Sequence, residues 1–448
     1  MIRSLVPCLL LLFVTQLQAS EYPFTLHKLV SSRAGPTILV IGGIQGDEPG
    51  GFTAASLLVT DYEVSRGEVW VVPNLNFESI LKRSRGVYGD MNRKFLQLQA
   101  NDPEYNAVSK IKRIITDKQV DIILNLHDGS GFYSQDYIDA DENPNRWGQS
   151  IVIDQSVIES ERYADLEAIA QRVINTANSS VGTEREGFLL KNTRTSEGDK
   201  EMEKTLTYFA IRNGKAAMGV EASKSYPTEK RVINHLRFVE AMFTEIGIEF
   251  QRSFKLSARS IKHKLGRDIQ LAIFDNKIVY DFDSARKTIS YVPLKKSAGI
   301  EFSTNNPLVA IVNSSSQIKV RYGNRSVTTL KPEYFDYDYF LTDVGMIVDG
   351  VETRVPMGSM VAVEDEFLIQ PIEDTRVNII GYRKSGHRNE SNLSVRKQEI
   401  GRRFSLDRQA QKFRVEFYRN NKYSGMILID FSGKTRIGAN RQKSASRL

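Results

Sequence analysis

The sequence predicts an α/β domain followed by two smaller all-β domains. Two observations support this fold class. Between residues 21 and 250, apolar runs alternate with segments of helical spacing, which is typical of a largely parallel sheet flanked by helices. After Phe250 short strand-like runs dominate, and they form two groups that divide near Thr342. We therefore expect domains at residues 21–250, 251–342 and 343–448, the last one a β-sandwich with a basic tail.

The individual elements follow from the period of the apolar residues. Uninterrupted apolar runs predict buried strands at Ile38–Ile41, Val69–Val72, Ile122–Leu126 and Ala216–Val220. A spacing of three to four residues predicts helices at Ala107–Ile115, Tyr163–Ala177, Lys200–Arg212 and Glu229–Ile246. Strands of the first β domain are predicted at Ile269–Phe274, Lys277–Asp281, Lys287–Val292 and Leu308–Val312. Those of the second are predicted at Gly345–Val348, Met360–Val363, Val377–Tyr382, Lys412–Tyr418 and Met426–Ile429.

The N-terminal stretch MIRSLVPCLLLLFVTQLQAS has the features of a secretory signal peptide. Arg3 supplies its positive charge, Leu5–Val14 its apolar core, and Ala19 and Ser20 the small residues suited to cleavage. An N-terminal membrane anchor is the alternative, but the run is short for a span of ~20 residues, and no later segment is apolar enough to cross a membrane. We expect residues 1–20 to be removed on export to a periplasm.

Composition narrows the classes of function further. The only cysteine is Cys8, inside the expected signal, so the mature chain has no disulfide and no thiolate nucleophile. The net charge of +7 is unevenly placed, because residues 1–250 are net acidic and residues 251–448 net basic. The basic half suits an anionic polymer or membrane surface, or is only a solvated face. The chain has no dense basic run, which argues against nucleic acid as a partner.

The first candidate site segment is IGGIQGDEPGG, residues 41–51, which follows a predicted buried strand. Gln45 and Glu48 have the spacing at which zinc hydrolases often place two ligands, although the first ligand is normally histidine. His127 directly follows another predicted strand. Because sites collect at strand ends in an open α/β sheet, we expect these three side chains together. They would supply the three protein ligands of a catalytic zinc, with weaker binding because an amide oxygen is a harder donor than imidazole. Taken singly, a polar turn and a strand-end histidine are more often structural.

Two further segments carry polar side chains that fit the same site. The loop RGVYGDMNRKF, Arg85–Phe95, offers two arginines and an asparagine. An arginine fork matches a carboxylate in bidentate fashion, although a solvated basic loop is the alternative. Glu221 ends a predicted strand, where it could accept a proton from water and pass it to a leaving amine. The alternative is an ordinary carboxylate that faces solvent.

The order of these four segments resembles the zinc metallocarboxypeptidases of the funnelin type, in the bacterial branch related to succinylglutamate desuccinylase. That family shows His-x-x-Glu after a strand, Arg with a following Asn-Arg, a later His, and a catalytic Glu near the end of the domain. The resemblance covers about residues 35–245, and Gln45 departs from the general pattern. With the export signal and two trailing β domains, the chain is more similar to the murein D,L-carboxypeptidases that set helical cell shape in epsilonproteobacteria such as Helicobacter and Campylobacter.

The resemblance implies a fold and a catalytic centre. The first domain is expected to have a carboxypeptidase-like mixed sheet, and the last domain to be immunoglobulin-like. Gln45, Glu48 and His127 would hold one zinc ion per chain. Glu221 would be the general base and then the general acid of the reaction.

The resemblance also implies residues that contact the substrate. Arg85 would polarise the scissile carbonyl and stabilise its oxyanion. Asn92 and Arg93 would bind the free carboxylate of the C-terminal residue. Trp147, in the loop after His127, would line the pocket, with a surface aromatic residue as the alternative. A family tyrosine that often closes over the substrate has no clear counterpart here.

The function implied is a periplasmic zinc carboxypeptidase that trims the peptidoglycan stem tripeptide L-Ala-γ-D-Glu-meso-diaminopimelate to the dipeptide and so shapes the cell. The two β domains would bind the cell wall or cell-shape protein partners. An N-acyl amino acid deacylase and a non-catalytic murein-binding protein are the alternatives. Export argues against the first, since such deacylases are usually cytoplasmic. Glu221 argues against the second, because a site without metal has no need of a base.

Overall fold

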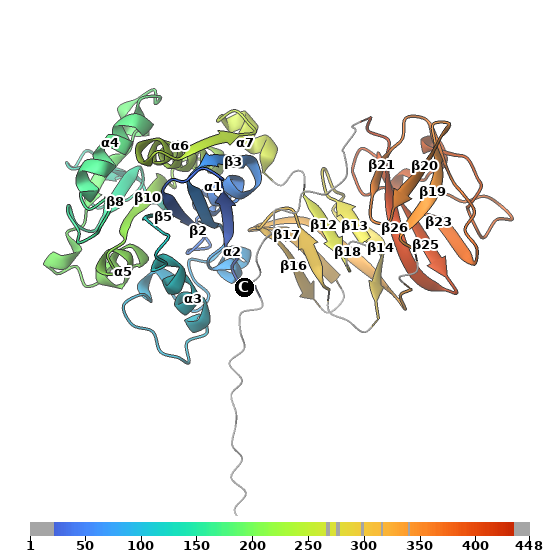
Figure 1. Cartoon of the computed structure of the whole chain (residues 1–448), viewed down its shortest axis with the longest axis horizontal. Coiled ribbons are helices and arrows are strands. Elements are labelled where there is room, and N and C mark those ends of the chain that lie inside the picture. The colour runs from blue at the N-terminus through green and yellow to red at the C-terminus, as the bar shows by residue number, and fades with distance from the viewer. Residues whose placement is uncertain are drawn as a thin grey trace, which may run out of the picture.

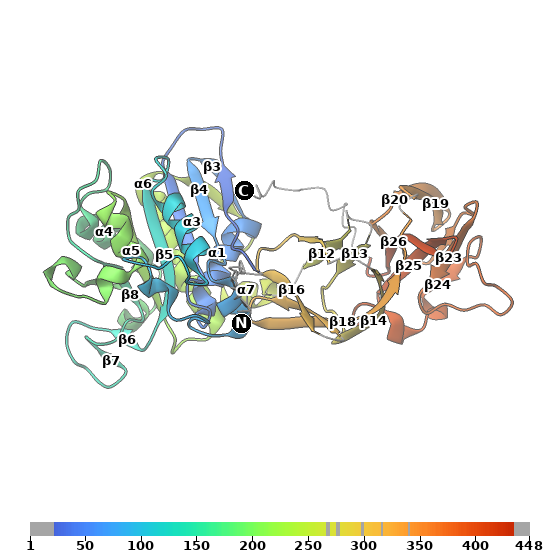
Figure 2. The ribbon, with the colours of Figure 1, turned by 90° about the horizontal axis from the view of Figure 1, so that it is seen from below.

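The structure of the protein is a computed structural model that describes residues 22–265, 269–274, 278–296, 300–314, 317–338 and 341–433. The expected signal peptide, Lys277 at the start of one predicted strand, and the basic tail after residue 433 lie outside the described residues. An α/β unit stands at one end of an elongated molecule, and two β units follow it in a row (Figures 1 and 2).

The α/β unit is built on one mixed seven-stranded sheet. Its spatial order is β1 (His27–Val30), β4 (Glu68–Val72), β2 (Thr37–Gly42), β5 (Ile122–Gly129), β10 (Ala216–Ser223), β8 (Ser150–Ile153) and β9 (Leu189–Asn192). The central strands β4, β2, β5 and β10 are parallel, whereas β1 and β8 pair antiparallel with β4 and β10. Every residue of β2 and β5 is buried, as expected for strands covered on both faces. The four predicted strands of this unit are therefore confirmed, and their carboxyl ends meet at one edge.

Helices cover both faces of the sheet, with α6 and α3 on opposite sides in Figure 1. They are α1 (Pro49–Asp61), α2 (Phe77–Lys82), α3 (Tyr105–Ile115), α4 (Leu166–Asn178), α5 (Leu206–Arg212), α6 (Thr228–Ile246) and α7 (Ala258–Lys264). Helices α3, α4 and α6 lie where the sequence predicts them, with shifted ends. None of the helices in the described part of the chain has the length and apolar character that a membrane crossing requires.

The prediction for α5 was wrong in its first half. The helix expected from Lys200 begins at Leu206, because the Thr205 side chain accepts a hydrogen bond from the Tyr208 backbone N–H at 3.2 Å and caps the helix. The residues before it form the short 3-10 turn η4 (Met202–Lys204). This later start places the N-terminus of α5 beside Asn92, whose side chain accepts from the Leu206 N–H.

The two β units are assembled from small sheets. The first holds a sheet of β13 (Ile278–Asp281), β12 (Gln270–Ile273) and β15 (Phe302–Thr304), and a sheet of β14 (Thr288–Lys295), β18 (Arg325–Phe335), β17 (Gln317–Tyr322) and β16 (Val309–Ser314). The second holds a sheet of β20 (Val351–Pro356), β19 (Asp343–Val348), β22 (Glu366–Ile369) and β24 (Val395–Arg396), and a sheet of β21 (Met360–Ala362), β26 (Lys422–Asp430), β25 (Lys412–Arg419) and β23 (Thr375–Ile379). Apolar side chains from both sheets of the second unit share one core, so this unit is a sandwich. The predicted α/β fold with two small all-β units is confirmed.

The α/β unit continues past the boundary expected at residue 250. Strand β11 (Glu249–Arg252) pairs with β3 (Tyr62–Arg66), and Ile261 of α7 packs in the core of the α/β unit. The division of the chain at 250 and 342 stays a prediction, and we propose that the first boundary follows Leu265.

Candidate active site

Three polar side chains converge at the carboxyl edge of the sheet. Gln45 and Glu48 lie in the turn between β2 and α1, and His127 lies on β5. The His127 Nδ1 atom is 3.2 Å from Gln45 Oε1 and 2.9 Å from Glu48 Oε2. All three are buried, with exposed fractions of 2%, 3% and 6%. The strand ends therefore bring together the three residues that the sequence singled out.

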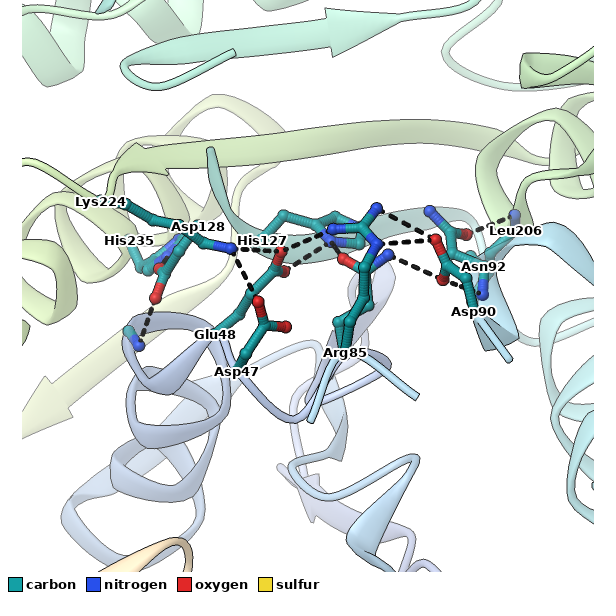
Figure 3. A network of polar contacts seen from close by, with 12 residues as sticks. Asp47, Glu48, Arg85, Asp90, Asn92, His127, Asp128, Leu206, Lys224 and His235 are labelled. Carbon is teal, nitrogen blue, oxygen red and sulfur yellow. Dashed lines mark hydrogen bonds and ion pairs between the residues drawn. The ribbon is translucent and has the colours of Figure 1, made fainter. Parts of the chain in front are cut away.

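Asp90, which sequence analysis did not single out, orients the Gln45 amide. Asp90 Oδ1 accepts a hydrogen bond from Gln45 Nε2 at 2.8 Å, so the amide oxygen Oε1 is the atom that faces His127. Asp90 Oδ2 lies 3.0 Å from the Arg85 guanidinium, and Oδ1 also accepts from the Asn92 backbone N–H (Figure 3). Burial tends to raise the pKa of Asp90, but the hydrogen bond from Gln45 and the charge of Arg85 hold it below its ordinary value. Asp90 lies inside the RGVYGDMNRKF motif, and its position shortly before Asn92 and Arg93 is the sequence feature that could have marked it as a site residue.

Glu221 faces the same centre from β10. The parallel register of β5 and β10 places it opposite His127. Burial raises the pKa of the Glu221 carboxyl to about 7, and the nearby carboxylates of Glu48 and Asp128 add to the rise, while His127 opposes it. A carboxyl group with a pKa near neutrality is suited to accept and return a proton at physiological pH.

The absence of a side chain at Gly129 leaves room for the Glu221 carboxylate. A Cβ atom at Gly129 would lie 2.8 Å from Glu221 Oε2 and 2.6 Å from the Trp147 carbonyl carbon. Trp147 is therefore close to Glu221, and the Lys191 ammonium lies 4.6 Å from the centre of its ring. The structure places the Trp147 backbone beside Gly129 and Glu221, and a role for its ring in lining the pocket stays a prediction.

Asp128 is a second residue that sequence analysis passed over, although it directly follows His127. Its Oδ2 accepts from the Gly50 backbone N–H and from Arg231 Nη1, both at 2.8 Å. Its Oδ1 lies 3.0 Å from His235 Nε2, and both residues are seen in Figure 3. The Asp128 side chain is fully buried. It joins the end of β5 to the first turn of α1 and to α6, and so fixes Glu48 relative to His127.

Two cations border the Glu48 carboxylate. Glu48 Oε1 lies 3.7 Å from Arg85 Nη1 and 3.4 Å from Lys224 Nζ, and Lys224 also contacts Asp47 at 3.1 Å. The Arg85 side chain is 51% exposed. Sequence analysis missed Lys224, which follows the β10 strand end by one residue.

Asn92 and Arg93 lie on the other side of Asp90, in the 3-10 turn η1 (Met91–Arg93). Asn92 is buried, and its Oδ1 accepts from the Leu206 N–H at 3.0 Å, which leaves its amide Nδ2 as a donor. Arg93 Nε is 3.6 Å from Glu201 Oε2. Asn92 is thus held next to the Arg85 loop by α5, whereas Arg93 is tied to an exposed acidic residue.

The converging donors fit a metal ion. Among the described residues, no three His, Cys, Asp or Glu side chains gather in a way that could hold a metal, so such a site here depends on Gln45. A ring nitrogen carries at most one hydrogen, yet two oxygen atoms converge on His127 Nδ1. An amide oxygen, a carboxylate and an imidazole have the same net charge as the usual two histidines and one glutamate of catalytic zinc sites.

Comparisons with known proteins show the family to which the chain belongs. Residues 10–266 match the model of a family described as carboxypeptidase controlling helical cell shape, catalytic, and residues 337–432 match the C-terminal domain of metallo-carboxypeptidase. The crystal structure of apo cell shape determinant protein Csd4 from Helicobacter pylori is 37% identical, with a TM-score of 0.84, and the match covers 91% of this chain and 99% of that one. No match was found among curated protein sequences.

Two other structures of the Helicobacter pylori protein were determined with ligands. The mDAP-bound form, described as a D,L-carboxypeptidase, is 37% identical with a TM-score of 0.84, and the match covers 90% of this chain and 99% of that one. The tripeptide-bound form is 36% identical with a TM-score of 0.84, and the match covers 91% of this chain and 99% of that one.

The fold and the matched families define the protein as a carboxypeptidase of the metal-dependent class. The chain belongs to the family of carboxypeptidases that control helical cell shape. The resemblance inferred from the four sequence segments is thereby confirmed, as is carboxypeptidase activity.

Proposed function

We propose that the protein is a periplasmic zinc D,L-carboxypeptidase that releases meso-diaminopimelate from the non-crosslinked stem tripeptide L-Ala-γ-D-Glu-meso-diaminopimelate. The observation that supports this most is the convergence of Gln45 Oε1, Glu48 Oε2 and His127 Nδ1 beside Glu221. The relatives solved with mDAP and with a tripeptide support the substrate class. The carboxypeptidase family does not favour the deacylase or the non-catalytic alternative.

Gln45, Glu48 and His127 would hold the metal, and Asp90 would keep the Gln45 oxygen turned toward it. When bound there, zinc acidifies water and polarises a carbonyl group. The family implies a metal, and zinc suits a donor set of one nitrogen and two oxygens that leaves room for a water. The amide oxygen is a harder donor than imidazole, so we expect weaker zinc binding than at a site with two histidines.

Glu221 would move the protons of the reaction. Its carboxylate accepts a proton from the attacking water, whose oxygen bonds to the γ-carbonyl carbon of D-glutamate. When the carbon–nitrogen bond breaks, Glu221 returns that proton to the leaving amine of diaminopimelate. The products are the dipeptide carboxylate and the free amino acid.

The Arg85 loop would bind and polarise the substrate. Arg85 lies next to Glu48, where its guanidinium can stabilise the oxyanion that forms on the scissile carbonyl. Asn92 Nδ2 and the Arg93 guanidinium would bind the free carboxylate that marks the C-terminal residue. Trp147, half-buried beside Glu221, would line the substrate site.

The test combines metal analysis with hydrolysis of muramyl tripeptide by residues 20–448. We expect about one zinc per chain and release of diaminopimelate. Glu221→Gln should lower the rate by about 10²–10⁴-fold without loss of zinc, because it removes the proton acceptor. Glu197→Gln, an exposed glutamate elsewhere on the unit, is the control. A Glu221→Gln rate equal to wild type would contradict the assignment, and cleavage of N-acyl amino acids alone would favour a deacylase.

Export and partner binding belong to the same proposal. The apolar stretch Leu5–Val14 and a cell-wall substrate support a periplasmic location. N-terminal sequencing of the mature protein should begin after Ala19 or Ser20, and a protein that starts at Met1 would contradict export. The basic β units would contact the cell wall or cell-shape protein partners. The location in cells of a shortened protein without residues 269–448, compared with that of the full-length protein, would test this.

A further inference from the structure

The first β unit touches the α/β unit at helices α1 and α2. The turn between β17 and β18 contains Gly323, which has a φ of +52°. A Cβ atom at Gly323 would lie 3.2 Å from Phe52 Cε2 and 3.7 Å from Ile80 Cγ2, so the turn packs on α1 and α2. Phe52, Ile80 and Tyr322 belong to one apolar core that crosses between the two units. Figure 1 shows β17 next to α2.

Arg321 and Arg83 reinforce this contact with hydrogen bonds. Arg321 Nη2 donates to Leu81 O at 3.1 Å and to Asn324 O at 2.9 Å. Arg83 Nε donates to the same Asn324 carbonyl at 2.7 Å. Leu81 lies in the last turn of α2, where carbonyl groups lack partners within the helix and attract cations. Arg321 from the β unit and Arg83 from the end of α2 thus donate to the same carbonyl group across the contact.

The candidate metal turn, which carries Gln45 and Glu48, also packs on α2 and on the residues that follow it. The Gly46 N–H donates to Ser84 O at 2.9 Å, and a Cβ atom at Gly46 would lie 2.0 Å from the Ser79 carbonyl carbon. Ser79 Oγ also accepts from the Val87 N–H at 3.0 Å. The turn that carries Gln45 and Glu48 and the loop that carries Arg85 thus rest on the same two serines. Any side chain at Gly46 would separate the metal turn from α2.

We propose that Arg321 is a positioning residue for the active site, and that the first β unit holds the end of α2 so that Arg85 and the Gln45–Glu48 turn keep their relative places. The proposal rests on the proposed function, because it assumes the roles given there to these residues. The β unit is then part of the catalytic machinery by its packing and not only a module for attachment to the cell wall.

The structure predicts which kinetic constant should change. Arg85 would act on the charge that forms during reaction, whereas Asn92 and Arg93 would bind the carboxylate in the ground state. Asn92 is held by Leu206 and Arg93 lies near Glu201, both away from the β17–β18 turn. Loosening α2 should therefore lower kcat more than it raises KM, and it should weaken zinc binding through the Gln45–Glu48 turn.

The experiment compares Arg321→Met with Lys319→Met in residues 20–448. Lys319 is an exposed cation on the same strand, so its replacement removes the same charge. We expect Arg321→Met to lower kcat by about tenfold or more, because a misplacement of about 1 Å can cost about 10²-fold. KM should be nearly unchanged, and zinc should bind more weakly. Arg321→Lys, which can still reach one carbonyl, should recover part of the kcat. Circular dichroism and thermal unfolding show that each variant is folded at the assay temperature.

The outcomes separate this inference from the proposed function. A folded Arg321→Met with wild-type kcat and zinc affinity would overturn it, as would equal losses in Lys319→Met. If Arg321→Met does not fold, Gly323→Ala takes its place in the experiment. The added Cβ, at a residue with positive φ, would press the turn against Phe52. An unchanged kcat and zinc affinity in this variant would again overturn the inference. If the wild type releases no diaminopimelate, the proposed function fails, and the zinc affinities alone decide the inference.

Discussion

Two aspartates organise two halves of the active site by different means. Asp128 is fully buried and fixes the strand-end half, where it joins β5 to α1 and α6. Asp90 is 19% exposed and fixes the loop half, where it contacts Gln45, Arg85 and Asn92. Burial and strand register therefore place Glu48 and His127, whereas a partly exposed carboxylate on a loop orients the Gln45 amide, Arg85 and Asn92.

The largest effect is expected from removing the charge of Asp128. Asp128→Asn leaves the nearly buried Arg231 without its counter-ion, and removal of one partner from a buried pair costs about 3–5 kcal/mol of stability. Asp141→Asn is the matched control, since its ion pair with Arg185 is about half exposed and contributes less than about 1 kcal/mol. Chemical unfolding measures the free energy of unfolding of both variants and of the wild type. Equal losses in the two variants would remove the contrast between the buried and the exposed aspartate.

A smaller effect, on activity and not on stability, is expected at Asp90. Asp90→Asn keeps the size of the side chain but removes the charge that holds Arg85 and the Gln45 amide. Loss of such a supporting group typically lowers metal affinity or activity by about 10–100-fold. Asp102→Asn, which removes a carboxylate paired with Lys94 on the same stretch of chain, should retain most of the activity. A fully active Asp90→Asn would show that the loop half does not need its aspartate.

The smallest effect is expected in the pH dependence of the metal-free protein. The pKa of Glu221 is raised to about 7 by burial. Burial lowers the pKa of His127, but the hydrogen bond and charge of Glu48 and the charge of Glu221 outweigh it and raise that pKa. The folded state therefore binds protons more tightly than the unfolded chain. The stability from these groups is present at low pH and is lost as pH rises toward 7 and above. A metal takes the place of the protons, so the rise in Tm on adding zinc should be larger at pH 8 than at pH 5.5.

Calorimetry with and without chelator measures this shift. Glu221→Gln should have a smaller pH dependence in its metal-free form, because one of the two titrating groups is gone. A zinc-induced rise in Tm that is equal at both pH values would contradict the linkage.

The sequence predicted the strand-end half of the site well, for a simple physical reason. Fully buried parallel strands appear as uninterrupted apolar runs, and their carboxyl ends meet at one edge, so Gln45, Glu48, His127 and Glu221 could be placed together. The resemblance to a known family then supplied the roles that residue chemistry alone left open.

Other features carry no comparable signal in the sequence. Helix α1 is buried along most of its length, so its sequence lacks the polar face that marks an amphipathic helix. Helix α5 begins after the capping residue Thr205, but the residues before Thr205 also have helical spacing, so the sequence pattern does not mark the start. The contact of Arg321 with Leu81 joins residues far apart in the chain, and only the packed structure brings them together.

The zinc affinity of Gln45 variants tests the proposed metal site most directly. If Gln45 Oε1 is a ligand, Gln45→Ala should lower the zinc affinity by more than about tenfold. Loss of a residue that only supports a ligand already costs about 10–100-fold, and loss of a ligand should cost no less. Gln45→His should bind zinc more tightly than wild type, because imidazole suits zinc better than an amide oxygen. Gln119→Ala, at an exposed position, should match wild type. Equal affinities for wild type and Gln45→Ala would show that glutamine is not a ligand and would contradict the proposed metal site.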